Sequence, residues 1–115
     1  MINIEINKYE DRMMAEIIVT GHADYDEIGK DIVCASVSIL TYTFAQIVKD
    51  LFDNGKLKEE PYIALNKGDS KVICICDSAD VFCDVLKSLQ MIDVGFSLLH
   101  HNYPDNVKLN TVIKA

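Results

Sequence analysis

The stretch GHADYDEIGKDIVCASVS, residues 21–38, decides how this chain folds, because it joins an extended segment to a long helix. From Asp31 to about Asp53 apolar residues recur at spacings of three and four, so the sequence predicts a helix of about six turns with one apolar face. Asn54 and Gly55 follow, a combination suited to a C-terminal cap in the left-handed backbone conformation. We expect this helix to be the central element of the core.

Extended segments flank the long helix on both sides. Residues 2–7 alternate isoleucine with polar residues, and residues 13–20 are rich in isoleucine and valine, so the two segments predict an antiparallel hairpin. Residues 62–66 and 70–76 predict a second hairpin around a turn at residues 67–69.

A second helix is expected after the second hairpin. Asp77 or Ser78 can cap it. Its apolar residues recur at spacings of four, four and three: Val81, Val85, Leu89 and Ile92. Gly95 lowers the helix propensity near the end, where a bend can occur. After a turn at residues 103–106, residues 107–113 predict a last strand.

The order strand, strand, helix, strand, strand, helix, strand predicts an α/β (α+β) sandwich of two layers. In this fold, two helices cover a mixed or antiparallel sheet. At 115 residues and 12.9 kDa the chain fits one domain, residues 1–115. Its 50% apolar and 25% charged residues are typical of a soluble globular protein and not of a disordered one.

Charge and the N-terminal residues limit the partners and the location. A formal net charge of −7 argues against binding nucleic acid through its phosphates and favours a basic peptide or protein as partner. An acidic cluster at residues 24–27 could attract a basic substrate. Neither an apolar run of about 20 residues nor a signal peptide is visible, since residues 1–13 alternate and carry acids. We therefore expect a cytoplasmic protein that does not bind a membrane.

The four cysteines are expected to be free thiols, because disulfides are rare in the cytosol. Cys74, Cys76 and Cys83 suggest a metal site at first glance. We expect the first two to point to opposite faces of one strand, however, where they could neither pair nor converge on a zinc ion. His100 and His101 are interpreted as structural or exposed residues near a helix end. The sequence predicts no metal and no cofactor.

His22 and Cys34 are the pair with the clearest chemistry. A cysteine nucleophile reacts as the thiolate, which the start of a helix and a nearby imidazolium stabilise. With Asp31 as N-cap, Cys34 would lie close to free backbone N–H groups that could receive an oxyanion. The eleven intervening residues could fold His22 back to within hydrogen-bond reach of the thiol. The alternative is a small buried cysteine and an ordinary loop histidine.

The other polar and small residues of this stretch have two interpretations each. Asp31 can cap the helix, which is worth about 1 kcal/mol, or orient the His22 imidazole as the third member of a triad. Ser38, one turn beyond the cysteine, can line the site or bond the carbonyl one turn back. Gly21 and Gly29 allow unusual backbone angles or the close approach of a substrate, but any strand-to-helix loop can use glycines in this way.

Taken together, Gly21-His22-Ala23, Gly29 and residues 31–38 (DIVCASVS) resemble the signature of the ribosomal-processing cysteine protease family, called Prp. The length, the strand order and the Tyr103-Pro104 turn are similar too, so the resemblance covers essentially the whole chain. Ser36 departs from the family pattern, since alanine or glycine is common at that position.

The resemblance implies a small cytosolic bacterial endopeptidase. Such an enzyme removes the N-terminal extension of the large-subunit ribosomal protein numbered twenty-seven and forms a homodimer. It implies Cys34 as nucleophile and His22 as general base, with Asp31 and Ser38 around the site. The substrate loop, which would order when substrate binds, would include three small residues: Gly21, Ala23 and Gly29.

Two other classes of function stay open at this point. A non-catalytic ribosome-associated binding or thiol-sensing module would bind a partner without cutting it, and Cys34 would then be structural or redox-active. A metal-dependent hydrolase would use His22 and Cys34 as ligands.

Overall fold

The computed structural model describes residues 1–27 and 29–114, which form five strands and two helices. Their order is β1 (Ile2–Tyr9), β2 (Met14–Gly21), α1 (Ile32–Asp53), β3 (Tyr62–Asn66), β4 (Asp69–Ile75), α2 (Ala79–Asn102) and β5 (Val107–Lys114). This is the predicted order. The expected domain ends at Ala115, which lies with Ile28 outside the described residues.

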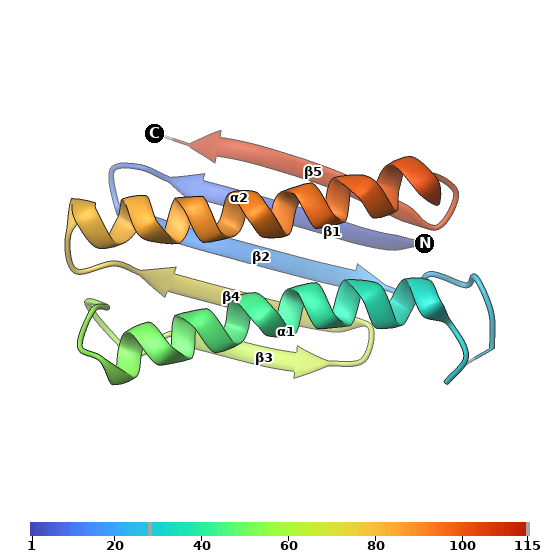
Figure 1. The fold of residues 1–115 in the computed structure, drawn as a ribbon, viewed down its shortest axis with the longest axis horizontal. Helices are drawn as coiled ribbons and strands as arrows, with labels where there is room; N and C mark the ends of the chain where they lie inside the picture. The colour runs from blue at the N-terminus through green and yellow to red at the C-terminus, as the bar shows by residue number, and fades with distance from the viewer. Residues whose placement is uncertain (28, 115) are drawn as a thin grey trace.

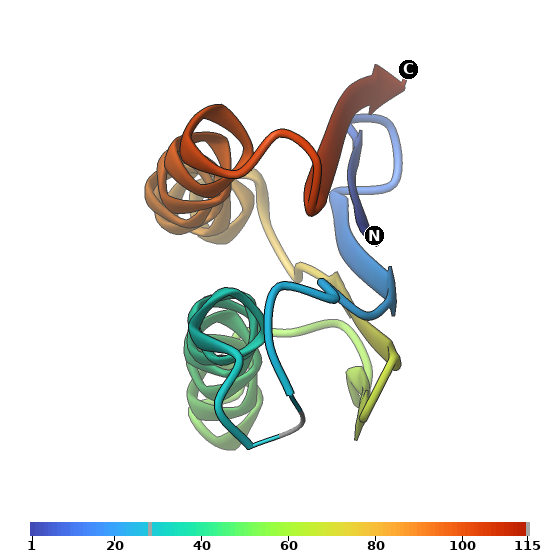
Figure 2. The same ribbon diagram turned by 90° about the vertical axis from the view of Figure 1, so that its right-hand side faces the viewer.

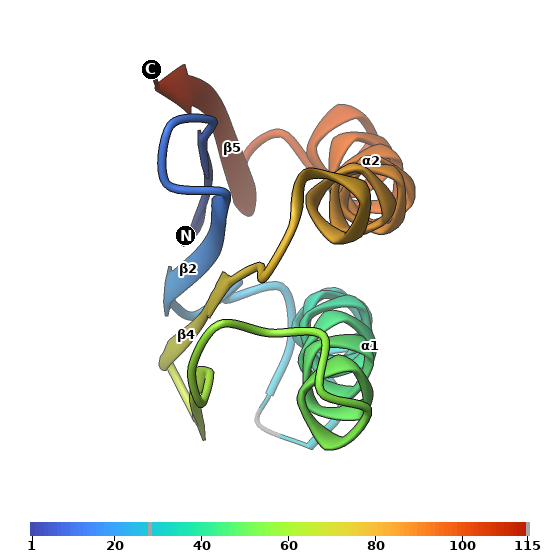
Figure 3. The ribbon, with the colours of Figure 1, turned by 90° about the vertical axis from the view of Figure 1, so that its left-hand side faces the viewer.

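The five strands form one mixed sheet in the order β3-β4-β2-β1-β5 (Figure 1). Neighbouring strands are antiparallel except β1 and β5, which pair in parallel with Ile2 opposite Val107. Both helices cover the same face of the sheet, as the two side views show (Figure 2, Figure 3). The predicted two-layer α+β sandwich is therefore confirmed, and its sheet is of the mixed kind.

The helix α1 packs its apolar face against the sheet, as the spacing of its apolar residues predicted. Its buried residues are Val33, Val37, Thr41, Phe44, Ala45 and Val48. Full burial of a valine or phenylalanine side chain stabilises the fold by about 1.5–3 kcal/mol. Asn54 caps the end of α1 and Gly55 follows with a φ of +70°, as the sequence predicted.

By length and composition alone, α1 could also cross a membrane, since its mean hydropathy is 1.5. An unbroken apolar run of about 20 residues is absent from the sequence, because serine and threonine recur along this helix and charged residues occur near its end. The core helix of a globular protein meets the same criterion, and α1 occupies that place here (Figure 1).

The helix α2 is longer than its apolar pattern suggested. Ser78 caps it by accepting a hydrogen bond from the N–H of Val81, and the helix continues past Gly95 to Asn102. A Cβ atom at Gly95 would lie 2.9 Å from both Cδ atoms of Leu40 on α1. The glycine therefore lets the two helices pack closely, and the helix does not end there.

Cys74 and Cys76 do not point to opposite faces, which corrects the sequence analysis. Residues two apart on a strand share a face, and both thiols are buried in the core under the helices, with exposed fractions of 1% and 0%. The hydrogen bond to Cys76, together with burial, raises the pKa of the Cys74 thiol, and the same bond lowers the pKa of Cys76. Cys83 is exposed on α2, and all four cysteines are free thiols, as predicted.

Candidate active site

The loop between β2 and α1 begins with a glycine that the fold requires. Gly21 has a φ of +88°, and a Cβ atom there would collide with the backbone carbonyl oxygen of Met1. The chain can therefore turn out of β2 and place His22 beside the start of α1. Gly29 also has a φ of +88° but faces open space, so only its backbone conformation favours glycine.

Asp31 is the N-cap of α1 and also holds the preceding loop. Its Oδ1 accepts hydrogen bonds from the N–H groups of Val33 and Cys34, both at 3.0 Å. Its Oδ2 accepts from the N–H of Tyr25 at 3.0 Å and of Asp26 at 3.3 Å. One carboxylate thus joins the helix start to the loop.

These bonds also lower the pKa of Asp31. Desolvation of the carboxylate raises its pKa, but the hydrogen bonds from four backbone N–H groups together lower it more, so the pKa lies below its ordinary value. Among the described residues, none of the bonds to Asp31 comes from His22, so in this structure Asp31 acts as the N-cap. The two roles do not exclude each other, and a role of Asp31 in orienting His22 stays a prediction.

Two of the N–H groups expected to be free at the helix start have an acceptor in the structure. The N–H groups of Val33 and Cys34 already donate to Asp31. The N–H of Ala23 is the group directed at the thiol, because it donates to Sγ of Cys34 at 3.4 Å.

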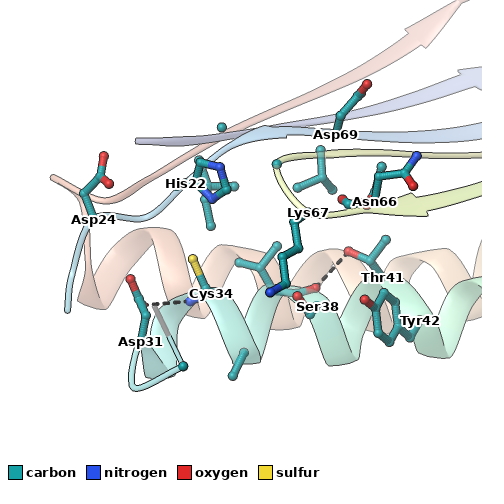
Figure 4. A pocket seen from close by; sticks show the side chains of 18 of the residues that line it. His22, Asp24, Asp31, Cys34, Ser38, Thr41, Tyr42, Asn66, Lys67 and Asp69 are labelled. Carbon is teal, nitrogen blue, oxygen red and sulfur yellow. Dashed lines mark hydrogen bonds between the residues drawn. The ribbon is translucent and has the colours of Figure 1, made fainter. Parts of the chain in front are cut away.

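Cys34 is partly buried in the first turn of α1, and its sulfur points across the site toward the His22 imidazole (Figure 4). In the described part of the chain, the hydrogen bond recorded for Sγ comes from Ala23 and not from His22. The structure thus brings the predicted pair to one site without joining them by a hydrogen bond in this conformation.

A cavity of about 490 Å³ lies between the loop, α1 and the β3–β4 turn. His22, Cys34 and Ser38 line it, as do Gly21 and Gly29. Among the described residues, no hydrogen bond from Ser38 to the carbonyl one turn back is found, whereas Thr41 makes such a bond to the carbonyl oxygen of Val37 at 2.8 Å. Ser38 lines the cavity, and its role in the reaction stays a prediction.

The β3–β4 turn also belongs to the site, although the sequence analysis treated it only as a turn. Residues 66–70 line the cavity, and the Lys67 side chain reaches over it toward Ser38 (Figure 4). The N–H of Gly21 donates to the carbonyl oxygen of Gly68 at 3.0 Å, which ties the turn to the loop between β2 and α1. No local sequence signal could have shown this, because the contact depends on the pairing of β2 with β4.

The turn between α2 and β5 supports the same loop from another side. The Asn106 side-chain amide donates to the carbonyl oxygen of Ala23 at 2.8 Å. The rings of Tyr25 and Tyr103 pack edge to face with centroids 5.2 Å apart. Of the late histidines, His100 contacts the carbonyl oxygen of Val107 through Nδ1, so it is structural, as the sequence analysis expected.

A thiol in the first turn of a long helix, facing a histidine across a cavity, is the arrangement that cysteine hydrolases use. The chain belongs to the family of the cysteine protease Prp, whose family model matches residues 1–108. It is therefore a cysteine protease of the ribosomal-processing family. Membership of this family argues against both alternatives, the non-catalytic binding module and the metal-dependent hydrolase.

Two relatives and two solved structures show how far the similarity extends. The ribosomal processing cysteine proteases Prp of two Staphylococcus aureus strains, Mu50 and NCTC 8325, are each 29% identical over 111 residues, covering 96% of this chain and 98% of theirs. The S. aureus Prp structure with a covalently linked product peptide is 26% identical, with a TM-score of 0.72 over 97% of this chain and all of that one. A Streptococcus mutans protein, 22% identical with a TM-score of 0.67 over 99% of this chain and 96% of its own, shares the fold.

Proposed function

We propose that this protease removes the N-terminal extension of the large-subunit ribosomal protein numbered twenty-seven, with Cys34 as nucleophile and His22 as general base. The observation that carries the proposal is the orientation of the Cys34 sulfur, which points toward His22 across a cavity large enough for peptide side chains (Figure 4). The match of residues 1–108 to the Prp family supports the substrate class.

Three features suit Cys34 to act as the nucleophile. The sulfur lies in the first turn of α1, where the helix dipole stabilises negative charge. The N–H of Ala23 donates to it. The His22 ring, which lines the same cavity, can accept the thiol proton and remain nearby as an imidazolium.

The reaction then proceeds in two stages. The sulfur forms a bond to the scissile carbonyl carbon, and the C–N bond breaks as His22 gives its proton to the leaving amine. Water, deprotonated by His22, next attacks the thioester and releases the new carboxyl end and the thiol. The hydrogen bond between Sγ and the His22 ring forms when substrate tightens the site, because the hydrogen bond that Sγ accepts in the free protein comes from Ala23.

The N–H of Ala23 is the first candidate for stabilising the oxyanion, since it lies 3.4 Å from the sulfur to which the substrate's carbonyl carbon would bind. The N–H of Cys34 can contribute only by being shared with Asp31, whose Oδ1 it now reaches at 3.0 Å. Catalysis therefore depends on how the loop holds Ala23.

Charge and a relative support the substrate. A chain with a formal net charge of −7 attracts a basic ribosomal protein, and such attraction speeds encounter in a salt-dependent way. The S. aureus relative holds a covalently linked product peptide, which agrees with a covalent step at a thiol. The homodimer and the cytoplasmic location stay predictions, which light scattering and cell fractionation can test.

The test is mass spectrometry of a peptide that spans the extension of the host ribosomal protein, incubated with the enzyme. We expect one cut by the parent protein and none by Cys34→Ala or His22→Ala. Cys83→Ala and His101→Ala are matched controls, because both side chains are exposed and neither lines the cavity. A Cys34→Ala protein that cuts at the parent rate would rule out the mechanism, and a parent that does not cut this peptide would rule out the substrate.

A further inference from the structure

The turn between β3 and β4 carries Gly68 directly against the His22 imidazole. We infer that Gly68 is a positioning residue for the general base: only a residue without a side chain lets the His22 ring lie where it does. This inference rests on the proposed roles of His22 and Cys34, and it concerns a position far from the sequence motif that contains them.

The contact is too close for any other amino acid. A Cβ atom built on Gly68 would lie 2.7 Å from Nε2 of His22, 3.0 Å from Cε1 and 3.5 Å from Cδ2. Non-bonded carbon contacts are optimal at about 3.5–4.0 Å. A methyl group at this position would therefore overlap the edge of the ring that carries Nε2.

The imidazole is the partner that would move. The Gly68 backbone is held by the hydrogen bond from the N–H of Gly21 to its carbonyl oxygen, at 3.0 Å. Asp69, the next residue, is paired in the sheet with Thr20. The His22 ring is the free end of one side chain at the rim of a cavity, so it can rotate away at lower cost than the sheet can open.

Displacing the His22 ring should lower the catalytic rate much more than the stability of the protein. A misplacement of about 1 Å in a catalytic group can cost about 10²-fold in rate. The fold would keep its sheet and core, because Gly68 and His22 contribute no buried apolar side chain to them. The expected defect of a Gly68→Ala variant is therefore in kcat.

Gly55 provides a matched control. Its φ of +70° is close to the +73° of Gly68, so an alanine carries similar backbone strain at either position. A Cβ atom at Gly55 meets nothing within 4 Å, and the residue lies beyond the end of α1, outside the cavity. The difference between the two alanine variants therefore isolates the contact with His22.

The experiment compares Gly68→Ala with Gly55→Ala by urea unfolding, by peptide cleavage and by the NMR signal of the His22 Cε1 proton. We expect equal losses of stability, a kcat about 10²-fold lower for Gly68→Ala with KM nearly unchanged, and a shifted His22 signal in that variant alone. His100 and His101 serve as internal references. Gly68→Asn and Gly55→Asn repeat the comparison if an alanine variant folds poorly, since asparagine tolerates this conformation better.

Parent-like kcat and an unmoved His22 signal in Gly68→Ala would overturn the inference while leaving the proposed function intact. If instead the parent protein does not cut the peptide, the proposed substrate fails, and the His22 signal then decides by itself. A signal that moves in the Gly68 variants only would still support the positioning role, and a signal that stays would overturn it.

Discussion

Replacing Asp31 should separate its two structural tasks, because each carboxylate oxygen performs one of them. Oδ1 caps α1 and Oδ2 holds the loop. In Asp31→Asn, the remaining carbonyl oxygen can still accept from the helix start, whereas the side-chain NH₂ cannot accept from the loop. Asp31→Ala loses both sets of bonds.

The expected magnitudes follow from the bond count. Loss of an N-cap costs about 1 kcal/mol, and we assign about 1 kcal/mol in total to the two exposed loop bonds. Asp31→Ala should therefore lower the free energy of unfolding by about 2 kcal/mol, and Asp31→Asn by about 1 kcal/mol. With an unfolding entropy of about 2.1 cal/mol/K per residue, these losses lower Tm by about 8 °C and about 4 °C.

Urea unfolding and calorimetry measure both losses, and amide hydrogen exchange of Tyr25 and Asp26 reports on the loop directly. Exchange there should become faster in both variants, while exchange at Val33 and Cys34 should become faster only in Asp31→Ala. Equal stability losses for the two variants would refute this division of labour between the two oxygens.

The lowered pKa of Asp31 adds a pH test with a definite sign. Because the folded pKa lies below the unfolded one, the ionised carboxylate stabilises the fold, fully so above the unfolded pKa of about 3.9. That contribution is lost as the pH falls through the folded pKa. The stability difference between the parent and Asp31→Asn should thus be constant from neutral pH to about pH 4 and shrink below it. A constant difference down to about pH 2 would contradict the lowered pKa.

Three further outcomes are expected. Gly95→Ala should destabilise the parent protein in urea unfolding, because its methyl group would overlap Leu40. In a Leu40→Ala background the same substitution should stabilise the protein by up to about 1 kcal/mol, and a loss of stability in both backgrounds would contradict the packing argument. Iodoacetamide mapping of native protein should label the exposed Cys83 but not the buried Cys74 and Cys76, and labelling of all three at a similar rate would contradict the burial. Asn106→Ala, which removes the bond to the loop carbonyl, should speed amide exchange in residues 22–24 and lower activity, and unchanged exchange would contradict its supporting role.

Much of the fold followed from neighbouring residues alone. The three- and four-residue spacing in α1 and the alternation in β1 reflect which side chains a helix or a strand brings to one face, and that depends only on backbone geometry. The same rule, correctly applied, would also have placed Cys74 and Cys76 on one face, so that error was avoidable. The cap at Asp31 was likewise readable, because it is formed within a few residues of chain.

The sequence by itself therefore determined the elements, the two-layer class and the family motif that contains His22 and Cys34. Only the tertiary structure decided that Gly68 and Asn106 contact the loop that joins His22 to Cys34. It also showed that Asp31 accepts hydrogen bonds from N–H groups that were expected to be free. The physical reason is range: helix and strand periodicity is set by residues a few positions apart. The contacts of Gly68 and Asn106, by contrast, depend on strand register and on how distant turns meet at one edge of the sheet.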